Sequence, residues 1–443
     1  MTSGLKRIGV SAGTLLALTF LRPSPAAADV VVTENGGWQL STDGRVNAFA
    51  SVARGTRVPE LQPDFPGSVT DDTEDTEDNI RSTRIRNGFL ASILGFKLQK
   101  EVSPNLKVTA RVALWMNISS GRTKNIPGPV DPRELYAKLE GGWGSFLGGS
   151  DLSLFGRGGI LTDAVIAHEY GVGYPCLIQD ASGGACGMAA FGAVFPGFEP
   201  GFVYTTPSLH GLELSLGAYD PANIGVGQLN RTPLPRLEGE LSYKLDDLLH
   251  VYANGFWQKL EGTIPNPGGV PVGSEIDIER KAWGAQAGAM VAVGPVMLGG
   301  AAFTGTGIAP ISHVSDHQTA VDKTGEPRKS WGAFGLGAFT FEALQLKVAG
   351  GAGIFHVDKT KNDGAPVSDT GVPQNPQVMK QNLGVTVGLY QNTGPVHFAL
   401  EYFRAEHTLY EYGQQRPDNP LLVDIRRPQQ AVNFINAGMT LVW

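Results

Sequence analysis

The chain has 443 residues, a formal net charge of −7 and a mean hydropathy of −0.07. The acidic balance argues against nucleic acid as a partner, and the mean hydropathy is too low for a membrane protein built from helices. Fifty-nine glycines and only two cysteines suit a protein whose strands are apolar on alternate residues.

The N-terminal 28 residues resemble a secretory signal peptide. Lys6 and Arg7 form a basic start, an apolar stretch follows at residues 8–21, and three alanines at residues 26–28 provide a small-residue cleavage site. We therefore expect export of the chain and one mature domain at residues 29–443.

Runs with strand character, bounded by turn residues, occupy most of the remaining chain. We expect sixteen strands, near residues 38–54, 82–101, 105–118, 133–141, 144–151, 199–206, 210–219, 233–245, 249–260, 279–293, 295–305, 330–341, 344–357, 378–391, 395–410 and 430–443. The connections after even-numbered runs are tight, and the connections after odd-numbered runs are long. This segregation predicts an all-β, transmembrane antiparallel barrel with short periplasmic turns and long external loops.

An acidic stretch lies in the first long connection, at residues 71–78. Its hard oxygen ligands make Asp71, Asp72, Glu74 and Asp75 weak candidates for binding Ca²⁺ or Mg²⁺. The spacing is not that of an EF-hand, so we favour a solvated acidic loop without a metal.

Two of the expected strands show opposite polarity on their two faces. In the run at 105–118, an apolar row that includes Val112 alternates with an inward row that includes Lys107 and Arg111. In the run at 233–245, Arg236, Glu238 and Glu240 share the inward face. Unpaired charges cost several kcal/mol each to bury, so these rows predict a water-filled lumen, with the solvated face of a soluble sheet as the alternative.

The longest connection, residues 152–198, contains both cysteines. An exported chain meets an oxidising compartment, so we expect a Cys176–Cys186 disulfide, worth ~3 kcal/mol in the chain-entropy model. A metal site is the rival interpretation, but the second Cys/His pair that zinc requires is missing. Residues 181–198 carry no charge, which suits a segment packed against an inner wall.

An uncharged stretch at residues 282–311 is long enough to span a bilayer as a helix of ~20 residues. Its seven glycines and the central Gly294-Pro295 pair favour two strands joined by a turn instead.

The last strand ends the chain on an aromatic residue. Ile435, Ala437, Met439, Leu441 and Trp443 share an apolar face, and the alternate residues form a smaller, more polar one. A chain that closes a barrel must finish in a strand that pairs with the first strand, and this segment fits that position.

The chain is similar to the general bacterial porins, the sixteen-stranded trimeric channels of Gram-negative outer membranes. The likeness rests on the opening strand at 44–50, the segment at 133–149 with its Gly-rich turn around Trp143, and the aromatic end of the last strand. The resemblance implies a homotrimer in the outer membrane, surrounded by outer-membrane lipid and lipopolysaccharide. It also implies passive diffusion of small hydrophilic solutes and ions, without a cofactor.

The resemblance further implies that the third long loop, at residues 152–198, folds into the pore and narrows it. Loop acids would then oppose a basic ladder on the wall, and such opposed charges bias ion passage. The candidate acids are Asp151, Asp163, Glu169 and Asp180, and the candidate cations are Arg45, Arg84, Arg86, Arg111 and Lys138.

Two other functions stay open at this point. A substrate-specific porin for sugars or phosphate would carry a continuous lumen row of arginines or aromatic residues, of which only fragments are visible. A secreted β-rich adhesin or binding protein would be soluble after export. We do not expect an enzyme, because the eight histidines are scattered and the chain lacks the common hydrolase, metalloprotease and phosphate-loop motifs.

Overall fold

The computed structural model describes residues 29–56, 79–116, 118, 130–161, 171–174, 186–222, 224, 229, 231–265, 275–308, 320–322, 324–363, 378–410, 412–415, 423–426 and 429–443. Several predictions fall outside these ranges. They concern the signal peptide at 1–28, the acidic residues Asp71, Asp72, Glu74 and Asp75, and the loop residues Asp163, Glu169, Cys176 and Asp180.

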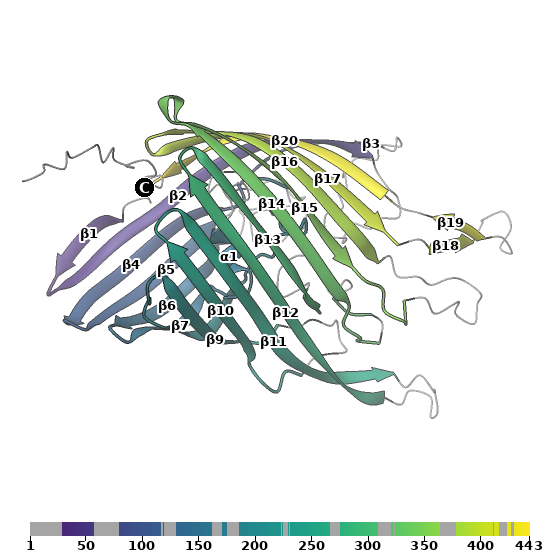
Figure 1. Ribbon diagram of the computed structural model, residues 1–443, viewed down its shortest axis with the longest axis horizontal. Helices are drawn as coiled ribbons and strands as arrows, with labels where there is room; N and C mark the ends of the chain where they lie inside the picture. Colours follow the sequence, from purple (N-terminus) through teal and green to yellow (C-terminus); the bar gives the residue numbers. More distant parts are fainter. Residues whose placement is uncertain are drawn as a thin grey trace, which may run out of the picture.

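The described strands form a closed antiparallel barrel (Figure 1). Pairing of β2 (Trp38–Thr56) with β20 (Gln429–Val442) closes it. On one side of β2, β4 (Ser92–Ser103) pairs with its first part and β3 (Asn79–Arg86) pairs with its second part, so β3 and β4 together fill one position of the wall. β1 (Val30–Asn35) pairs with the start of β2 and adds no further position. The 18-stranded sheet of the described residues therefore provides sixteen wall positions, which confirms the expected barrel.

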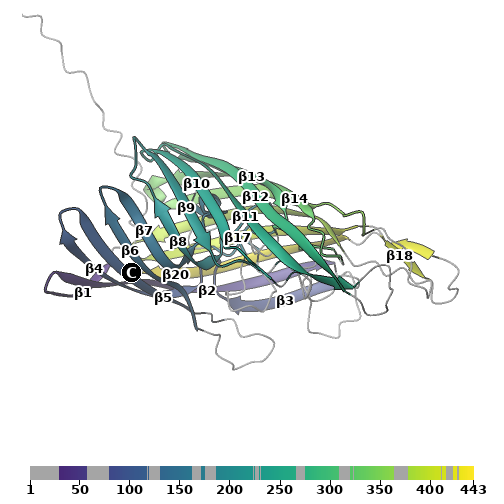
Figure 2. The same ribbon diagram turned by 90° about the horizontal axis from the view of Figure 1, so that it is seen from below.

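The other wall strands follow one another around the barrel in chain order. They are β5 (Leu106–Met116), β6 (Val130–Gly141), β7 (Gly144–Leu152), β8 (Phe198–Thr205), β9 (Leu212–Tyr219), β10 (Arg236–Leu245), β11 (Leu249–Pro265), β12 (Glu275–Val293), β13 (Val296–Thr306), β14 (Lys329–Phe341), β15 (Leu346–Val357), β16 (Met379–Thr393) and β17 (Val396–Leu409). A short 3-10 helix, η1 (Glu342–Leu344), turns the chain between β14 and β15. A separate hairpin, β18 (Tyr412–Gln415) and β19 (Val423–Arg426), projects from the rim with the long loops (Figures 1 and 2).

The uncharged stretch forms two strands, as expected. β12 and β13 meet at the Gly294-Pro295 turn and pair from Val293–Val296 up to Trp283–Thr306. In the described part of the chain, no helix has the length and apolar character needed to cross a bilayer.

The expected strand at 82–101 is broken in two. Residues 87–91 leave the sheet, where the side chain of Asn47 accepts a hydrogen bond from the Gly88 N–H at 2.9 Å. The Phe89 N–H then donates to the carbonyl of Gly171 in the third loop at 2.8 Å. The break therefore allows a contact with the third loop. The alternation of apolar and polar residues within 82–101 does not predict this contact.

Both described ends of the expected loop at 261–278, residues 261–265 and 275–278, are strand. β11 and β12 stay paired from Glu261–Glu279 to Pro265–Glu275. The inward side chains Leu260, Ile264 and Ile278 are buried, so the period of two continues beyond the membrane-spanning part of the hairpin.

Alternation of the two faces follows the sequence prediction. On β5, Val112 is exposed on the outside, while Thr109, Ala113 and Trp115 are buried on the inside. On β20, Ile435, Met439 and Leu441 are each about half exposed, whereas Phe434, Asn436 and Thr440 are buried. Gly44 and Trp443 exchange two backbone hydrogen bonds of 3.0 Å, so the two ends of the barrel sheet are joined at this rim.

Candidate functional site

The third loop enters the lumen directly after β7, through the short helix α1 (Arg157–Leu161). The Phe155 N–H donates to Glu238 Oε2 at 2.8 Å, and the Gly156 N–H donates to Asn254 Oδ1 at 3.3 Å. Arg157 Nε donates to Glu240 Oε1 at 3.1 Å. Since Glu238 and Glu240 lie on β10 and Asn254 on β11, these contacts anchor the start of the loop on the inner wall.

An ion pair lies beneath this anchor. Arg236 Nε and Glu238 Oε1 are 2.8 Å apart, and neither side chain is exposed. The alternation in the sequence predicted that both side chains face a water-filled lumen, and this prediction is wrong for Arg236 and Glu238. They are buried under the third loop, where they pair with each other and where Glu238 also accepts a loop N–H.

The far part of the loop is held by a second buried carboxylate, Glu401 on β17. Glu401 Oε2 accepts the N–H groups of Val172 and Gly173 at 2.7 and 3.1 Å, and its Oε1 accepts the Tyr390 hydroxyl at 2.5 Å. Asn436 Nδ2 donates to the Gly173 carbonyl at 2.9 Å. The loop therefore crosses the lumen from the β10 wall to β17 and β20, which confirms that it folds into the pore.

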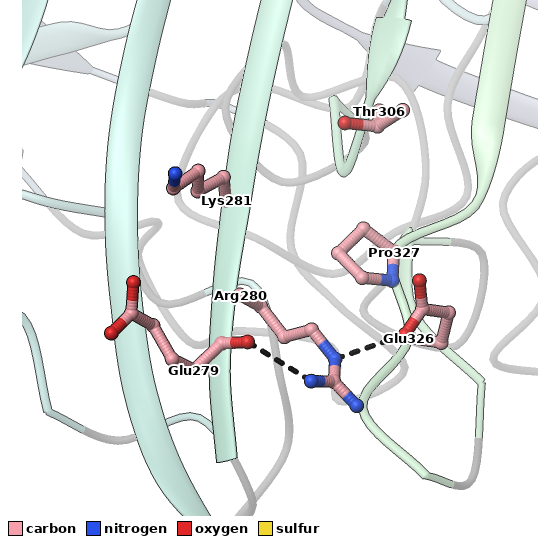
Figure 3. Close-up of a pocket in the computed structure, with 6 residues that line it drawn as sticks. All are labelled: Glu279, Arg280, Lys281, Thr306, Glu326 and Pro327. Carbon is pink, nitrogen blue, oxygen red and sulfur yellow. Dashed lines mark hydrogen bonds and ion pairs between the residues drawn. The ribbon is translucent and has the colours of Figure 1, made fainter.

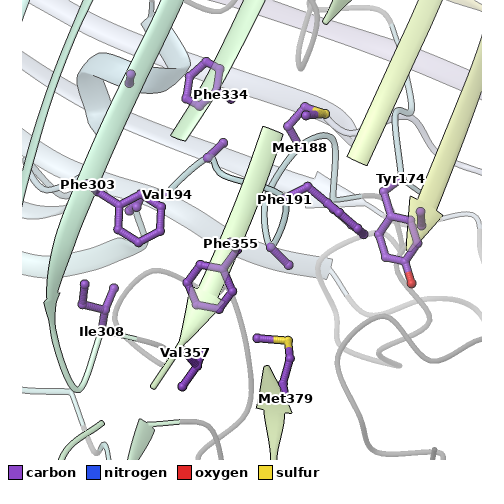
Figure 4. Packing of buried hydrophobic residues seen from close by; sticks show 14 of the residues in the cluster. Tyr174, Met188, Phe191, Val194, Phe303, Ile308, Phe334, Phe355, Val357 and Met379 are labelled. Carbon is purple, nitrogen blue, oxygen red and sulfur yellow. The ribbon is translucent and has the colours of Figure 1, made fainter. Parts of the chain in front are cut away.

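Aromatic packing fixes the loop between these anchors (Figure 4). The Phe191 ring lies 4.8 Å from Tyr174 and 5.2 Å from Phe403, measured between centroids. A Cβ at Gly384 would come within 2.8 Å of the Phe191 Cβ, and a Cβ at Gly353 would clash with the Phe191 carbonyl oxygen. These wall glycines leave room for the loop. Burial in this cluster raises the pKa of the Tyr174 hydroxyl.

The lumen is consequently asymmetric. On one side, the inward residues Phe303, Phe334, Phe355 and Phe403 are at most 5% exposed and pack with the loop. On the opposite side, charged inward residues remain accessible: the side chains of Arg111 and Glu134 are 15% exposed, and those of Lys97 and Lys138 are 23% and 32% exposed. Water therefore reaches β4, β5 and β6, while β13 to β17 are dry near the loop.

The candidate cations occupy several different environments. Arg111 Nη2 donates to Asp43 Oδ1 at 2.9 Å, and its Nε donates to Glu134. Lys138 Nζ lies 2.8 Å from Glu140 Oε1. The Arg45 guanidinium lies 5.8 Å from the Trp115 ring, and Arg133 lies 4.8 Å from the same ring.

Arg84 and Arg86 lie on β3, nearer the rim with the long loops, and Arg86 is only 3% exposed. Asp151 lies on β7 rather than on the loop, directly opposite Glu199 of β8. Among the described residues the wall itself carries both signs, and the expected opposition of loop acids to wall cations stays a prediction because Asp163, Glu169 and Asp180 lie outside those residues.

Sequence reasoning missed Asp43, Arg133, Glu134, Glu199, Arg157 and Glu401. The alternation that identified Arg111 also places Asp43 and Glu134 on the inner face, so a fuller count of inward residues would have found them. Cys186 is disulfide-bonded, and Cys176 lies outside the described residues. Within the described ranges, His, Cys, Asp and Glu form no group of three or more suited to a metal ion.

Known proteins share this architecture. A family model described as "Gram-negative porin" matches residues 12–413. The outer membrane channel DcaP of Acinetobacter baumannii superimposes with a TM-score of 0.57 at 14% identity, covering 92% of this chain and 99% of that chain. An anion-selective porin from Comamonas acidovorans gives a TM-score of 0.55 at 12% identity, with coverage of 92% and 100%.

OmpT of Vibrio cholerae gives a TM-score of 0.52 at 12% identity, with coverage of 93% and 100%. No protein with a curated description matches the sequence. At these identities the structural likeness concerns the fold alone, and the family model carries the assignment.

The chain belongs to the Gram-negative porin family. It is an outer-membrane protein whose barrel forms a channel for passive diffusion.

Proposed function

We propose that solutes cross the barrel along the inner face of β4 to β8, between this wall and the third loop. The asymmetry of burial carries this proposal. The opposite wall is covered by the loop, whereas Lys97, Arg111 and Lys138 keep 15–32% of their side-chain surface exposed. Charged groups stay ionised at a low free-energy cost only where water reaches them. Hydrophilic solutes therefore pass most easily along this hydrated wall.

The charges on this wall favour a general channel with weak ion selectivity. Arg111 lies between Asp43 and Glu134, and Lys138 lies beside Glu140, so that cations and acids alternate around the barrel. A channel specific for phosphate would need an uncompensated row of cations, and the described part of this wall has none. The anion selectivity of the Comamonas acidovorans neighbour is therefore not proposed for this chain.

Planar-bilayer recordings under a salt gradient test the pathway. Arg111→Gln leaves Asp43 and Glu134 without their shared cation, so the reversal potential shifts toward cation preference. One unit charge about 10 Å from a permeating ion in water contributes about 0.4 kcal/mol, with opposite sign for cation and anion, so the cation-to-anion permeability ratio changes about fourfold. Arg231→Gln, an equal charge change on an external segment where Arg231 pairs with Asp277, serves as the control.

An Arg111→Gln channel with the wild-type reversal potential would exclude this wall as the pathway. Saturable block of the current by a sugar or by phosphate would instead support the substrate-specific alternative.

We propose that the protein works as a homotrimer embedded in outer-membrane lipid and lipopolysaccharide, and that it catalyses no reaction. One solved form of the OmpT neighbour is described as a trimer. The exposed apolar side chains on the outer wall, such as Val46, Phe96 and Phe202, suit contact with lipid or with another subunit. Native mass spectrometry of the detergent-solubilised protein measures the number of subunits.

We also propose that Cys176 pairs with Cys186 and that export removes residues 1–28. Cys186 is disulfide-bonded, and it is one of two cysteines in the chain. Intact mass of the purified protein, before and after reduction and alkylation, tests both statements.

A further inference from the structure

The third loop returns to the barrel wall through residues 193–198, here called its return arm. Phe195 packs edge-on against Phe89, with ring centroids 5.2 Å apart. Phe198, the first residue of β8, packs against Trp115 of β5 at 4.9 Å, and Trp115 is only 4% exposed. The position at which these rings hold the return arm therefore decides how much room is left for solutes along β4 to β8.

The side chain of Arg133 on β6 contacts two of these rings. Its guanidinium carbon lies 4.8 Å from the centroid of the Trp115 ring and 5.7 Å from that of the Phe198 ring. The side chain is 12% exposed, and its Nε donates to Asp131 Oδ2 at 2.8 Å. A cation within about 6 Å of an aromatic ring is attracted by the ring quadrupole, more strongly where water is excluded. Arg133 therefore joins the wall strand β5 to the return arm.

A β-bulge in β6 brings Arg133 to this position. Counting in twos from Leu135, which is exposed on the outer wall, Arg133 would also lie outside. The pairing with β5 shifts at this point, so that Pro132 and Arg133 lie opposite the single residue Leu114. An extra residue of this kind re-aims the side chains beside it. On the other side of β6, the Ser150 hydroxyl of β7 donates to the Arg133 carbonyl at 2.8 Å.

A second arginine holds Trp115 from the wall. The Arg45 guanidinium carbon lies 5.8 Å from the centroid of the Trp115 ring, and Arg45 Nε donates to the Ala91 carbonyl at 3.2 Å. Trp115 Nε1 lies 3.4 Å from Glu134 Oε1. These contacts join Trp115 to wall strands and to the segment between β3 and β4. They leave the link from Trp115 to the return arm to Phe198 and Arg133.

We propose that Arg133 is a positioning residue of the channel. Through Trp115 and Phe198 it holds the return arm against β5 and β6, and this contact limits the width of the pathway. The proposal rests on the solute pathway proposed above and names the residue that sets its size limit. Without the guanidinium only the contact between the two rings remains, so the arm should leave the wall about tenfold more often.

Liposome swelling with uncharged sugars tests the proposal, because the entry of an uncharged solute depends on pore width and not on lumen charge. Arabinose, sucrose and raffinose are compared for wild type, Arg133→Gln and Arg133→Lys. We expect the rate of raffinose entry relative to arabinose to rise in Arg133→Gln. The ratio should stay near the wild-type value in Arg133→Lys, which keeps a cation over the rings.

Arg280→Gln is the matched control. It removes the same residue type from an external pocket of about 310 Å³ beside β12, where Arg280 Nε lies 3.1 Å from Glu326 Oε2 (Figure 3). This variant should keep the wild-type ratio, because the pocket lies outside the proposed pathway.

Hydrogen–deuterium exchange of peptides that contain residues 193–198 measures the opening of the return arm directly. Opening should be about tenfold more frequent in Arg133→Gln. Phe198→Leu should raise exchange at least as much. Adding Arg133→Gln to Phe198→Leu should change little, because the contact through which Arg133 acts is then already lost.

An unchanged raffinose-to-arabinose ratio in Arg133→Gln would overturn the proposal. An Arg133→Lys channel that matches Arg133→Gln, or a further tenfold gain in exchange when Arg133→Gln is added to Phe198→Leu, would also overturn it. A wild-type protein that admits none of the three sugars would refute the channel proposal instead. Faster exchange of the return arm in Arg133→Gln would still support the contact in that case, so the two proposals can fail separately.

Discussion

Removal of the Glu401 carboxylate isolates the contribution of the second anchor of the third loop. Glu401 is 2% exposed and accepts the N–H groups of Val172 and Gly173. Glu401→Ala leaves both donors without an acceptor in a buried position. Each such donor costs about 1–3 kcal/mol, and partial entry of water into the vacated space reduces the sum. We expect the loop to lose about 2–4 kcal/mol of local stability.

This loss is measurable as faster local opening. Every 1.4 kcal/mol is a tenfold change in an equilibrium constant, so opening of residues 171–174 should become about 30- to 700-fold more frequent. Hydrogen–deuterium exchange of peptides that contain these residues reports the change directly. Peptides from the β11–β12 hairpin should exchange as in the wild-type protein, because the wall itself keeps its pairing.

Two variants serve as controls. Glu406→Ala removes the same residue type from the same strand, where Glu406 lies on the face opposite to Glu401 and pairs with Arg404. Glu401→Gln retains a carbonyl acceptor and should give an intermediate rate. Wild-type exchange at residues 171–174 in Glu401→Ala would refute the reasoning, since the aromatic contacts of Phe191 would then suffice to hold the loop.

Two further predictions concern the wall and the external loops. Gly353→Val clashes with the Phe191 carbonyl oxygen, so it should destabilise the packed loop by about 1–3 kcal/mol and alter the open-channel current; Gly335→Ala, whose Cβ meets nothing within 4 Å, should leave the current unchanged. Burial alone would raise the pKa of Asp322, but hydrogen bonds from Thr360, Thr324 and Asn362 lower it to about 2. Because this lies below the ordinary aspartate pKa of 3.8, the stabilisation is complete above about pH 4 and is lost as the pH falls through about 2. Pepsin should therefore cleave segments 320–328 and 358–363 faster at pH 2 than at pH 4, whereas Asp322→Asn should be cleaved readily at both; equal resistance of wild type at both pH values would contradict the assignment.

The wall of the barrel could be derived from the sequence because its pattern is local. Alternation with a period of two places Val112 outside and Arg111 inside without knowledge of any other strand. Turn residues such as Gly294-Pro295 mark the hairpins, and the aromatic end at Trp443 marks the closing strand. The number of strands, their placement in the membrane and the two faces of each strand could therefore be predicted from residues close together in the chain.

The interior could not be derived in this way because its contacts join distant segments. Glu401 and Val172 are 229 positions apart, and nothing near Glu401 indicates that it accepts a loop N–H. Only the path of the third loop decides that Arg236 and Glu238 are buried while Arg111 and Lys138 stay wet. The sequence by itself determined the barrel and the inward direction of its charges. The tertiary structure decided which of those charges meet water, because burial by a loop depends on the whole fold.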